Sequence, residues 1–176
     1  MKRVFLGLMV LVLLTACLPW SPAFAIGTHA CGQPVSVTPA NATLQATQTY
    51  TVTCQWQDDP SNPGNVPSVV IPGTRATDSP SLLGWYPYQV DVWPGTTAPT
   101  NGYTLTLTVL IGSTAFDLLS GGSGTSLTFS STTGTFVSAQ GNGKPFRRVI
   151  GPLTGNISGN SVASGSGSYT ITFVPQ

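Results

Sequence analysis

Apolar and polar residues alternate along much of the chain. Between Tyr50 and Gln57 every second residue is apolar or aromatic, and the residues between them are Thr or Gln. From Tyr103 to Ile111 the same alternation recurs, with Thr at most of the polar positions. A period of two is typical of a β-strand that lays one face on a core. Both segments are therefore predicted strands.

Shorter runs of the same kind predict further strands between turn signals. The runs are Val35–Thr38, Val66–Ile71, Tyr88–Trp93, Thr114–Leu119, Ser126–Ser130, Thr135–Ala139, Phe146–Ile150 and Tyr169–Val174. Clusters of Gly, Pro, Asn and Ser separate them, and we find no capped run with helical periodicity. The stretch Gly155–Ser168 is predicted to be a long loop. Together these patterns predict an all-β fold, a single immunoglobulin-like antiparallel β-sandwich.

The N-terminal segment predicts export. Met1–Arg3 is basic, Val4–Ala16 is apolar but too short to span a bilayer, and Ala23–Ala25 has the small residues of a cleavage site. We expect a signal peptide over residues 1–25 and the sandwich over 26–176. As an alternative, Leu14–Cys17 resembles the bacterial lipobox. Cleavage after residue 16 would then leave Cys17 for lipid attachment, and only this lipid would bring the protein to a membrane.

Two cysteines remain in the predicted domain. They are Cys31 and Cys54, and an even number in an oxidising compartment favours a disulfide over a metal or redox site. A loop of this length would remove roughly 3 kcal/mol of chain entropy from the unfolded state. The sequence therefore predicts a Cys31–Cys54 bridge.

Charge excludes some partners and leaves others open. Without the predicted signal peptide, four Lys and Arg residues stand against five Asp, a net charge of −1. Nucleic acid is not an expected partner, because backbone binding needs clustered cations. So small a net charge also does little to keep copies of the chain apart. We expect a secreted protein of a bacterial cell surface that associates with itself or with related subunits.

Few residues are suited to catalysis. The chain has no Glu and a single His, His29, which lies near the expected mature N-terminus and which we expect to be an exposed terminal residue. Asp91 and Asp117 fall within predicted strands, where a solvent-facing side chain is the simpler interpretation. We therefore predict no enzymatic activity, no catalytic residue and no cofactor.

An acidic loop is the one candidate for metal binding. Asp58 and Asp59, with Asn62 and Asn65, could supply oxygen ligands to Ca²⁺. Their spacing does not match an EF-hand, and the intervening prolines favour an ordinary turn. We accordingly predict no metal site.

An aromatic segment is the candidate for ligand binding. It contains Trp85, Tyr86, Tyr88 and Trp93, and exposed rings in a row can stack on the rings of a glycan. In the alternative interpretation Tyr88 lies in the core with Val90 and Val92, and Trp93 packs on the core at the strand end.

The end of the chain resembles a known family. Gly167–Phe173, an alternating strand close to the C-terminus, is similar to the closing strand of the spore coat protein U-like domains, the subunits of archaic chaperone–usher pili. The Cys31 and Cys54 pair resembles their early disulfide. The resemblance implies an incomplete sandwich that is completed by a strand from the next subunit. Only Ile26–Ala30 precede Cys31 in the expected mature chain, so the donor role of that family is not carried over to any residue here.

These observations predict a structural subunit of a cell-surface filament or coat. The subunits would assemble through free strand edges at Tyr103–Ile111 and above all at the terminal strand, whose apolar row is Tyr169, Ile171 and Phe173. Neither segment has a charge or a proline to protect its edge. The alternative is a secreted or lipid-anchored binding module that recognises glycans through the aromatic segment.

Overall fold

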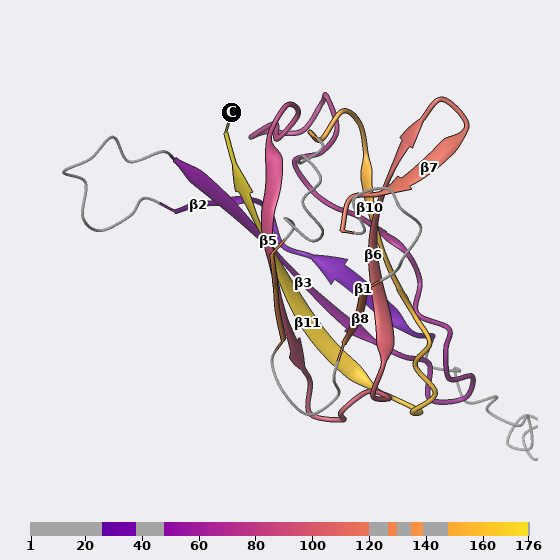
Figure 1. Cartoon of the computed structure of the whole chain (residues 1–176). Coiled ribbons are helices and arrows are strands. Elements are labelled where there is room, and N and C mark those ends of the chain that lie inside the picture. The colour runs from indigo at the N-terminus through magenta and orange to yellow at the C-terminus, as the bar shows by residue number, and fades with distance from the viewer. Residues whose placement is uncertain (1–25, 38–47, 120–126, 130–134, 139–147, 176) are drawn as a thin grey trace, which may run out of the picture.

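The structure is a computed structural model, and it describes residues 26–37, 48–119, 127–129, 135–138 and 148–175. Within these residues the chain forms eleven strands and no helix, and all strand pairs are antiparallel. The strands make two sheets that enclose a core (Figure 1). The predicted all-β sandwich is confirmed. The predicted signal peptide and Cys17 lie outside the described residues.

The larger sheet has six strands. They are β1 (Thr28–Cys31), β2 (Val35–Val37), β3 (Thr49–Gln57), β11 (Ser166–Val174), β5 (Tyr86–Pro94) and β9 (Thr135–Ser138). Their order is β1-β3-β11-β5-β9, and β2 pairs with the first residues of β3 on the same side as β1. The C-terminal strand β11 therefore lies in the middle of this sheet.

The smaller sheet has five strands. They are β4 (Val69–Val70), β10 (Leu153–Ser158), β6 (Tyr103–Ile111), β7 (Thr114–Asp117) and β8 (Leu127–Phe129). β6 pairs with β10 on one side and with β7 and β8 on the other. The β6–β7 hairpin projects from the upper right of the sandwich in Figure 1.

Alternating side chains of both sheets fill the core. In β11 the predicted apolar row, Tyr169, Ile171 and Phe173, is fully buried. Facing it, β6 contributes Leu105 and Leu107, also without exposed surface. Burial of each such side chain contributes about 1.5–3 kcal/mol, so these two strands contribute much of the apolar stabilisation.

The prediction of open edges at β6 and β11 is wrong. β11 is hydrogen-bonded to β3 along one side and to β5 along the other, and its apolar row points into the core. β6 is flanked in the same way by β10 and by β7 and β8. The absence of charge and proline in these strands therefore reflects their central position, because both edges of each strand are hydrogen-bonded to neighbouring strands.

Two strands and one loop differ from the sequence prediction. β1 and β10 were not predicted, and the stretch expected to be a loop from Gly155 to Ser168 contains most of β10 and the start of β11. The apolar alternation of β10, Leu153 and Ile157, is interrupted by Gly155. A Cβ at this glycine would collide with the hydroxyl of Tyr169, so packing in the core requires glycine here. The same glycine breaks the apolar alternation by which the strand could have been predicted. The described part of the predicted strand Phe146–Ile150, residues 148–150, is not a strand.

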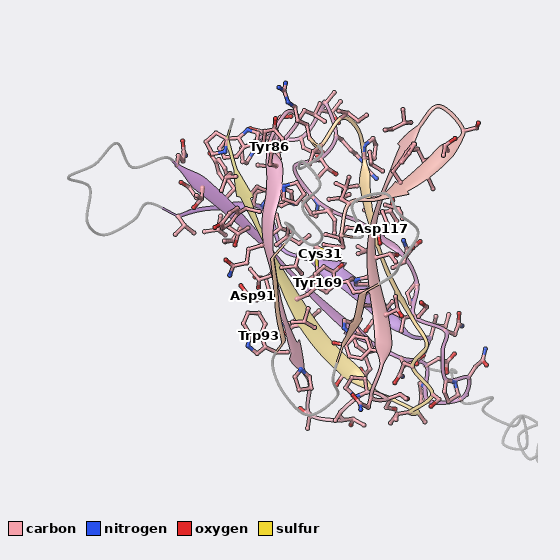
Figure 2. All side chains as sticks on the ribbon, in the orientation of Figure 1. Cys31, Tyr86, Asp91, Trp93, Asp117 and Tyr169 are labelled. Carbon is pink, nitrogen blue, oxygen red and sulfur yellow. A yellow bond between two sulfur atoms is a disulfide. The ribbon has the colours of Figure 1, made fainter. Side chains whose placement is uncertain are left out.

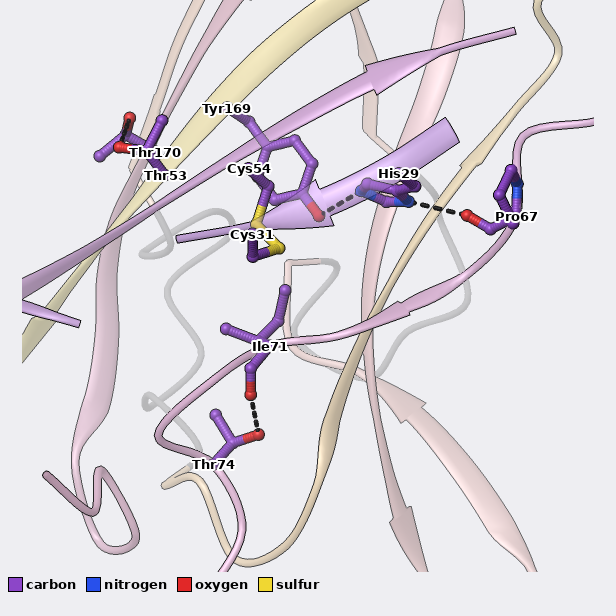
Figure 3. The surroundings of a disulfide bond; sticks show 9 residues. All are labelled: His29, Cys31, Thr53, Cys54, Pro67, Ile71, Thr74, Tyr169 and Thr170. Carbon is purple, nitrogen blue, oxygen red and sulfur yellow. Dashed lines mark hydrogen bonds between the residues drawn. A yellow bond between two sulfur atoms is a disulfide. The ribbon is translucent and has the colours of Figure 1, made fainter. Parts of the chain in front are cut away.

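The predicted disulfide is confirmed. β1 pairs with β3 so that Cys31 lies directly opposite Cys54, and their sulfur atoms are bonded (Figure 3). Cys54 is fully buried. The bridge thus ties the short first strand to β3, its neighbour in the sheet.

Candidate functional site

The outer surface of the six-stranded sheet is a polar face. We use this name for the outward-pointing side chains of β1, β3, β11 and β5. They include Thr28, Ala30, Thr53, Gln55, Gln57, Ser166, Ser168, Thr170, Thr172, Gln89, Asp91 and Trp93. The same alternation that buries one side of each strand places these residues on the other side. Hydroxyl and amide groups dominate this face, and Asp91 is its only charged member.

Strand register arranges these residues in rows across the sheet. Trp93 is paired with Ser168, which is paired with Gln55, which in turn is paired with Ala30. The next row contains Asp91, Thr170 and Thr53, and the two threonine hydroxyl oxygens are 2.9 Å apart. Figure 2 shows Asp91 and Trp93 on the side of β5 that faces away from the smaller sheet. Residues about 40 and 75 positions apart in sequence thus share one surface.

Two of the four predicted aromatic residues are exposed. The side chain of Trp93 retains 45% of its accessible surface and that of Tyr88 retains 44%. The interpretation of Tyr88 as a core residue is wrong, because the pairing of β5 with β11 shifts by one residue between Thr172 and Phe173. Such a bulge breaks the alternation, so Tyr88 points outward while Val90 and Val92 remain buried. The interpretation of Trp93 as packed on the core is also wrong.

The other two aromatic residues make contacts within the protein. Trp85 is half-buried, and its ring meets that of Tyr50 edge to face with centroids 5.1 Å apart. The hydroxyl of Tyr86 accepts a hydrogen bond of 2.8 Å from Nε of Arg148. The structure therefore does not bring the four aromatic residues together as one row, and only Trp93 adjoins the polar rows described above.

A hollow of about 510 Å³ lies at one end of the polar face. Its volume is within the range of ordinary small-molecule sites. Gln55 and Gln57 line it from β3, Ser168 from β11 and Thr28 from β1. The loop from Gly95 to Thr97, which directly follows Trp93 and Pro94, also lines it. None of the described residues that line this hollow is charged.

His29 is part of the fold and is not an exposed terminal residue as predicted. It is half-buried, and its Nδ1 lies 2.8 Å from the carbonyl oxygen of Pro67 (Figure 3). Because a carbonyl only accepts, Nδ1 carries the proton and Nε2 accepts from the hydroxyl of Tyr169, also at 2.8 Å. Burial lowers the pKa of the imidazole, and the bond to Pro67 offsets this only in part. Burial likewise raises the pKa of the Tyr169 hydroxyl.

The acidic loop uses its oxygens to hold its own backbone. Asp58 is fully buried and accepts hydrogen bonds from the backbone amides of Asp59, Gly64 and Asn65. It also accepts one from the side-chain amide of Asn160. Asp59 accepts from the amides of the two residues that follow Pro60. These contacts describe a closed turn, and the part of the chain that the structure describes has no cluster of three metal-binding side chains.

The expected solvent-facing aspartates differ from one another. Asp91 lies on the polar face, half-buried, and accepts a 2.7 Å hydrogen bond from the Gln89 amide. Asp117 instead accepts from the backbone amides of Leu107 and Leu119 at 3.0 and 3.1 Å. Asp117 therefore serves to fix the end of β7 against β6.

Sequence reasoning missed the hollow. Gln55 and Gln57 were recognised as the polar positions of a strand, but their neighbours across the sheet depend on register. The one sequence feature that pointed to this part of the surface was Trp93 at a strand end, followed directly by the Pro94–Gly95 turn. Alternation with the buried Val90 and Val92 puts Trp93 on the outer side of the strand, but it does not show that a hollow lies nearby.

Comparisons with known proteins add no further assignment. No family model, curated protein or solved structure matches the chain. Over the described residues, no helix is long and apolar enough to cross a membrane.

Proposed function

We propose that this protein is an exported, non-enzymatic binding module that recognises neutral carbohydrate through its polar face. One observation carries the proposal: the exposed indole of Trp93 lies in a surface that hydroxyl and amide groups dominate, with Asp91 as its one charged side chain. An indole stacks on the apolar face of a sugar ring. Thr, Ser and Gln side chains both donate and accept hydrogen bonds, as sugar hydroxyls do.

Charge supports a neutral ligand. Asp91 is the only ionised group of the polar face, and Gln89 already donates to it. A phosphorylated or acidic glycan would need cations that these strands do not present. The predicted export, which rests on the N-terminal sequence, would bring such a face into contact with extracellular polysaccharide.

The proposal includes no catalytic step. The imidazole of His29 is engaged by Tyr169 and by Pro67 and lies on the inner side of β1, away from the polar face. Asp58 and Asp117 hold backbone amides. Glycoside hydrolysis requires two carboxyl groups that flank the bound sugar, whereas the polar face carries only Asp91.

Binding to polysaccharides with a matched pair of variants tests this function. Purified full-length protein is incubated with insoluble cellulose, xylan, mannan, chitin and starch, and the bound fraction is measured. Trp93→Ala should reduce binding at least tenfold, since stacking of one large ring contributes about 1.5 kcal/mol or more. Leu110→Ala, which truncates a 66% exposed apolar side chain of the other sheet, should bind like the natural protein. Equal binding by both variants, or none by the natural protein, would refute the proposal.

A second candidate function is a structural subunit of a filament or coat, as the family resemblance implies. The short strand β2 favours it. β2 pairs only with β3 among the described strands, and Val35 and Val37 are 61% and 42% exposed. An apolar edge strand without charge can pair with another chain. Here assembly would use β2, with the terminal strand β11 kept inside its own sheet.

Sedimentation of the purified protein separates the two candidates. A structural subunit should form high-mass species at rising concentration, and Val37→Lys should disperse them, because charge on an edge strand opposes pairing. Leu110→Lys places the same charge on the other sheet and should leave the assemblies intact. A protein that remains monomeric at all concentrations would contradict the structural role.

A further inference from the structure

The hollow beside Trp93 lies where a ligand stacked on the indole would continue. Trp93, Ser168 and Gln55 belong to one row across β5, β11 and β3. Ser168 and Gln55 line the hollow, and Trp93, which is not among the lining residues, is the direct partner of Ser168 on the neighbouring strand. The exposed ring and the hollow are thus two parts of one continuous surface.

We infer that the hollow is a subsite for an uncharged oligosaccharide chain that crosses the strands from Trp93 toward β1. This inference rests on the proposed function and names its ligand class. Adjacent strands are separated by about 4.8 Å, so the backbones at Trp93 and Gln55 lie roughly 10 Å apart. A single sugar ring stacked on the indole does not reach over this separation. Two or more linked units do.

The groups that line the hollow suit sugar hydroxyls. Gln55 and Gln57 are exposed, and within the described residues neither side-chain amide makes a hydrogen bond. Each amide offers two donors and one acceptor, and the hydroxyls of Thr28, Ser166 and Ser168 add further groups of both kinds. A carboxylate or phosphate would meet no cation here, which selects for a neutral chain.

The wall of the hollow is held by the backbone. The amide of Gly95 donates to the carbonyl of Ser166 at 2.8 Å, and the amide of Ser166 donates to the carbonyl of Thr97 at 2.8 Å. A Cβ at Gly95 would collide with Ser166, so glycine permits this close approach. The loop is therefore fixed before a ligand arrives, and binding does not have to order it.

Calorimetry with oligosaccharides of increasing length tests the subsite. The full-length protein is titrated with β-1,4-linked series of glucose, xylose, mannose and N-acetylglucosamine and with α-1,4-linked glucose, each from one to six units. Affinity for the recognised series should rise from one unit to the length that spans both parts of the surface. The double variant Gln55→Ala/Gln57→Ala should lose about tenfold in affinity for the long chains, as expected from two neutral hydrogen bonds, and should bind short chains unchanged.

Two comparisons distinguish the possible failures. Gln33→Ala removes a similar exposed amide outside the hollow and should leave all affinities unchanged, and thermal unfolding should show that every variant is folded. If Trp93→Ala loses binding but the double variant binds every length like the natural protein, the subsite is refuted and the binding module stands. If the natural protein binds none of the five series, both the subsite and the proposed function are refuted.

Discussion

The hydroxyl of Tyr169 donates a hydrogen bond of 2.8 Å to Nε2 of His29, and this contact joins β11 to β1. The rings also meet edge to face with centroids 5.7 Å apart. Through Nδ1 the same imidazole donates to Pro67, so one side chain connects three segments (Figure 3). The single histidine is therefore a structural link beside the disulfide.

Acid should weaken this link. The pKa of His29 is lowered mainly by burial, so the folded protein favours the neutral imidazole and the unfolded chain binds the proton more readily. The stabilisation is fully present above the ordinary pKa of about 6.5 and is lost as the pH falls through the lowered value in the folded state. Urea unfolding between pH 8 and pH 4 should show this loss for the natural protein.

His29→Gln provides the control for the pH dependence. Glutamine keeps a donor and an acceptor but does not titrate, so the difference in unfolding free energy between the two proteins should shrink as the pH falls. A difference that is constant with pH would show that the titration of His29 does not contribute. Carbohydrate binding at neutral pH should be unchanged in this variant, since His29 lies off the polar face.

The disulfide should be a major source of stability for β1. Cys31 and Cys54 are 23 residues apart, and opening a loop of that length costs about 3 kcal/mol in unfolding free energy. Cys31→Ser/Cys54→Ser should lower the urea midpoint accordingly. The same shift should follow reduction of the natural protein, and two free thiols in the protein as purified from the cell exterior would contradict the bridge.

Gly155 and Tyr169 should be energetically coupled. A Cβ at position 155 would meet the Tyr169 hydroxyl, so Gly155→Ala should destabilise the protein by about 1–3 kcal/mol through overpacking. In a Tyr169→Phe background the hydroxyl is gone, and the same substitution should cost clearly less. A double-mutant cycle by denaturant unfolding measures this difference.

Gly151→Ala is the matched control for that cycle. A Cβ at Gly151 would meet no atom within 4 Å, so this substitution should leave the unfolding free energy nearly unchanged. If Gly155→Ala costs the same with Tyr169 and with Phe at position 169, the hydroxyl is not the obstacle.

Alternation predicted the strands whose polar and apolar positions are uninterrupted. β6 begins and ends at the predicted residues, and β3 differs by one residue, because the alternation within them is broken only by Leu110 near the end of β6. β10 was not predicted because Gly155 interrupts its apolar alternation, and a larger residue at this position would collide with the Tyr169 hydroxyl. Tyr88 was misplaced by a bulge that only the pairing of β5 with β11 reveals.

The residues of the candidate site come together through the order of the strands in the sheet, which the local pattern of apolar and polar residues does not reveal. The sequence placed Gln55 on the polar side of a strand and Trp93 at a strand end. That β11 lies between them follows from the order of strands, which local periodicity does not determine. For the same reason the terminal strand was predicted at an edge and is found in the middle.

The acidic loop gives the last prediction. Asp58 accepts hydrogen bonds from three backbone amides and from Asn160, whose own side-chain oxygen accepts from the amide of Thr100 at 2.8 Å. Asp58→Ala would leave several buried donors without an acceptor and should cost about 3 kcal/mol or more. Asp58→Asn keeps one acceptor oxygen and should cost less. Urea unfolding of the three proteins measures the order.

The effect of calcium on thermal unfolding tests whether this turn is a metal site. Since the carboxylate oxygens are already used by amides, addition of CaCl₂ or EDTA should leave the Tm of the natural protein unchanged. A ligand that binds only the folded state raises Tm with its concentration, so a rise that saturates with calcium would show that the loop binds the ion. If Asp58→Ala then abolished that rise, the oxygens of Asp58 would be ligands, and the closed turn described here would be the metal-free form of a calcium site.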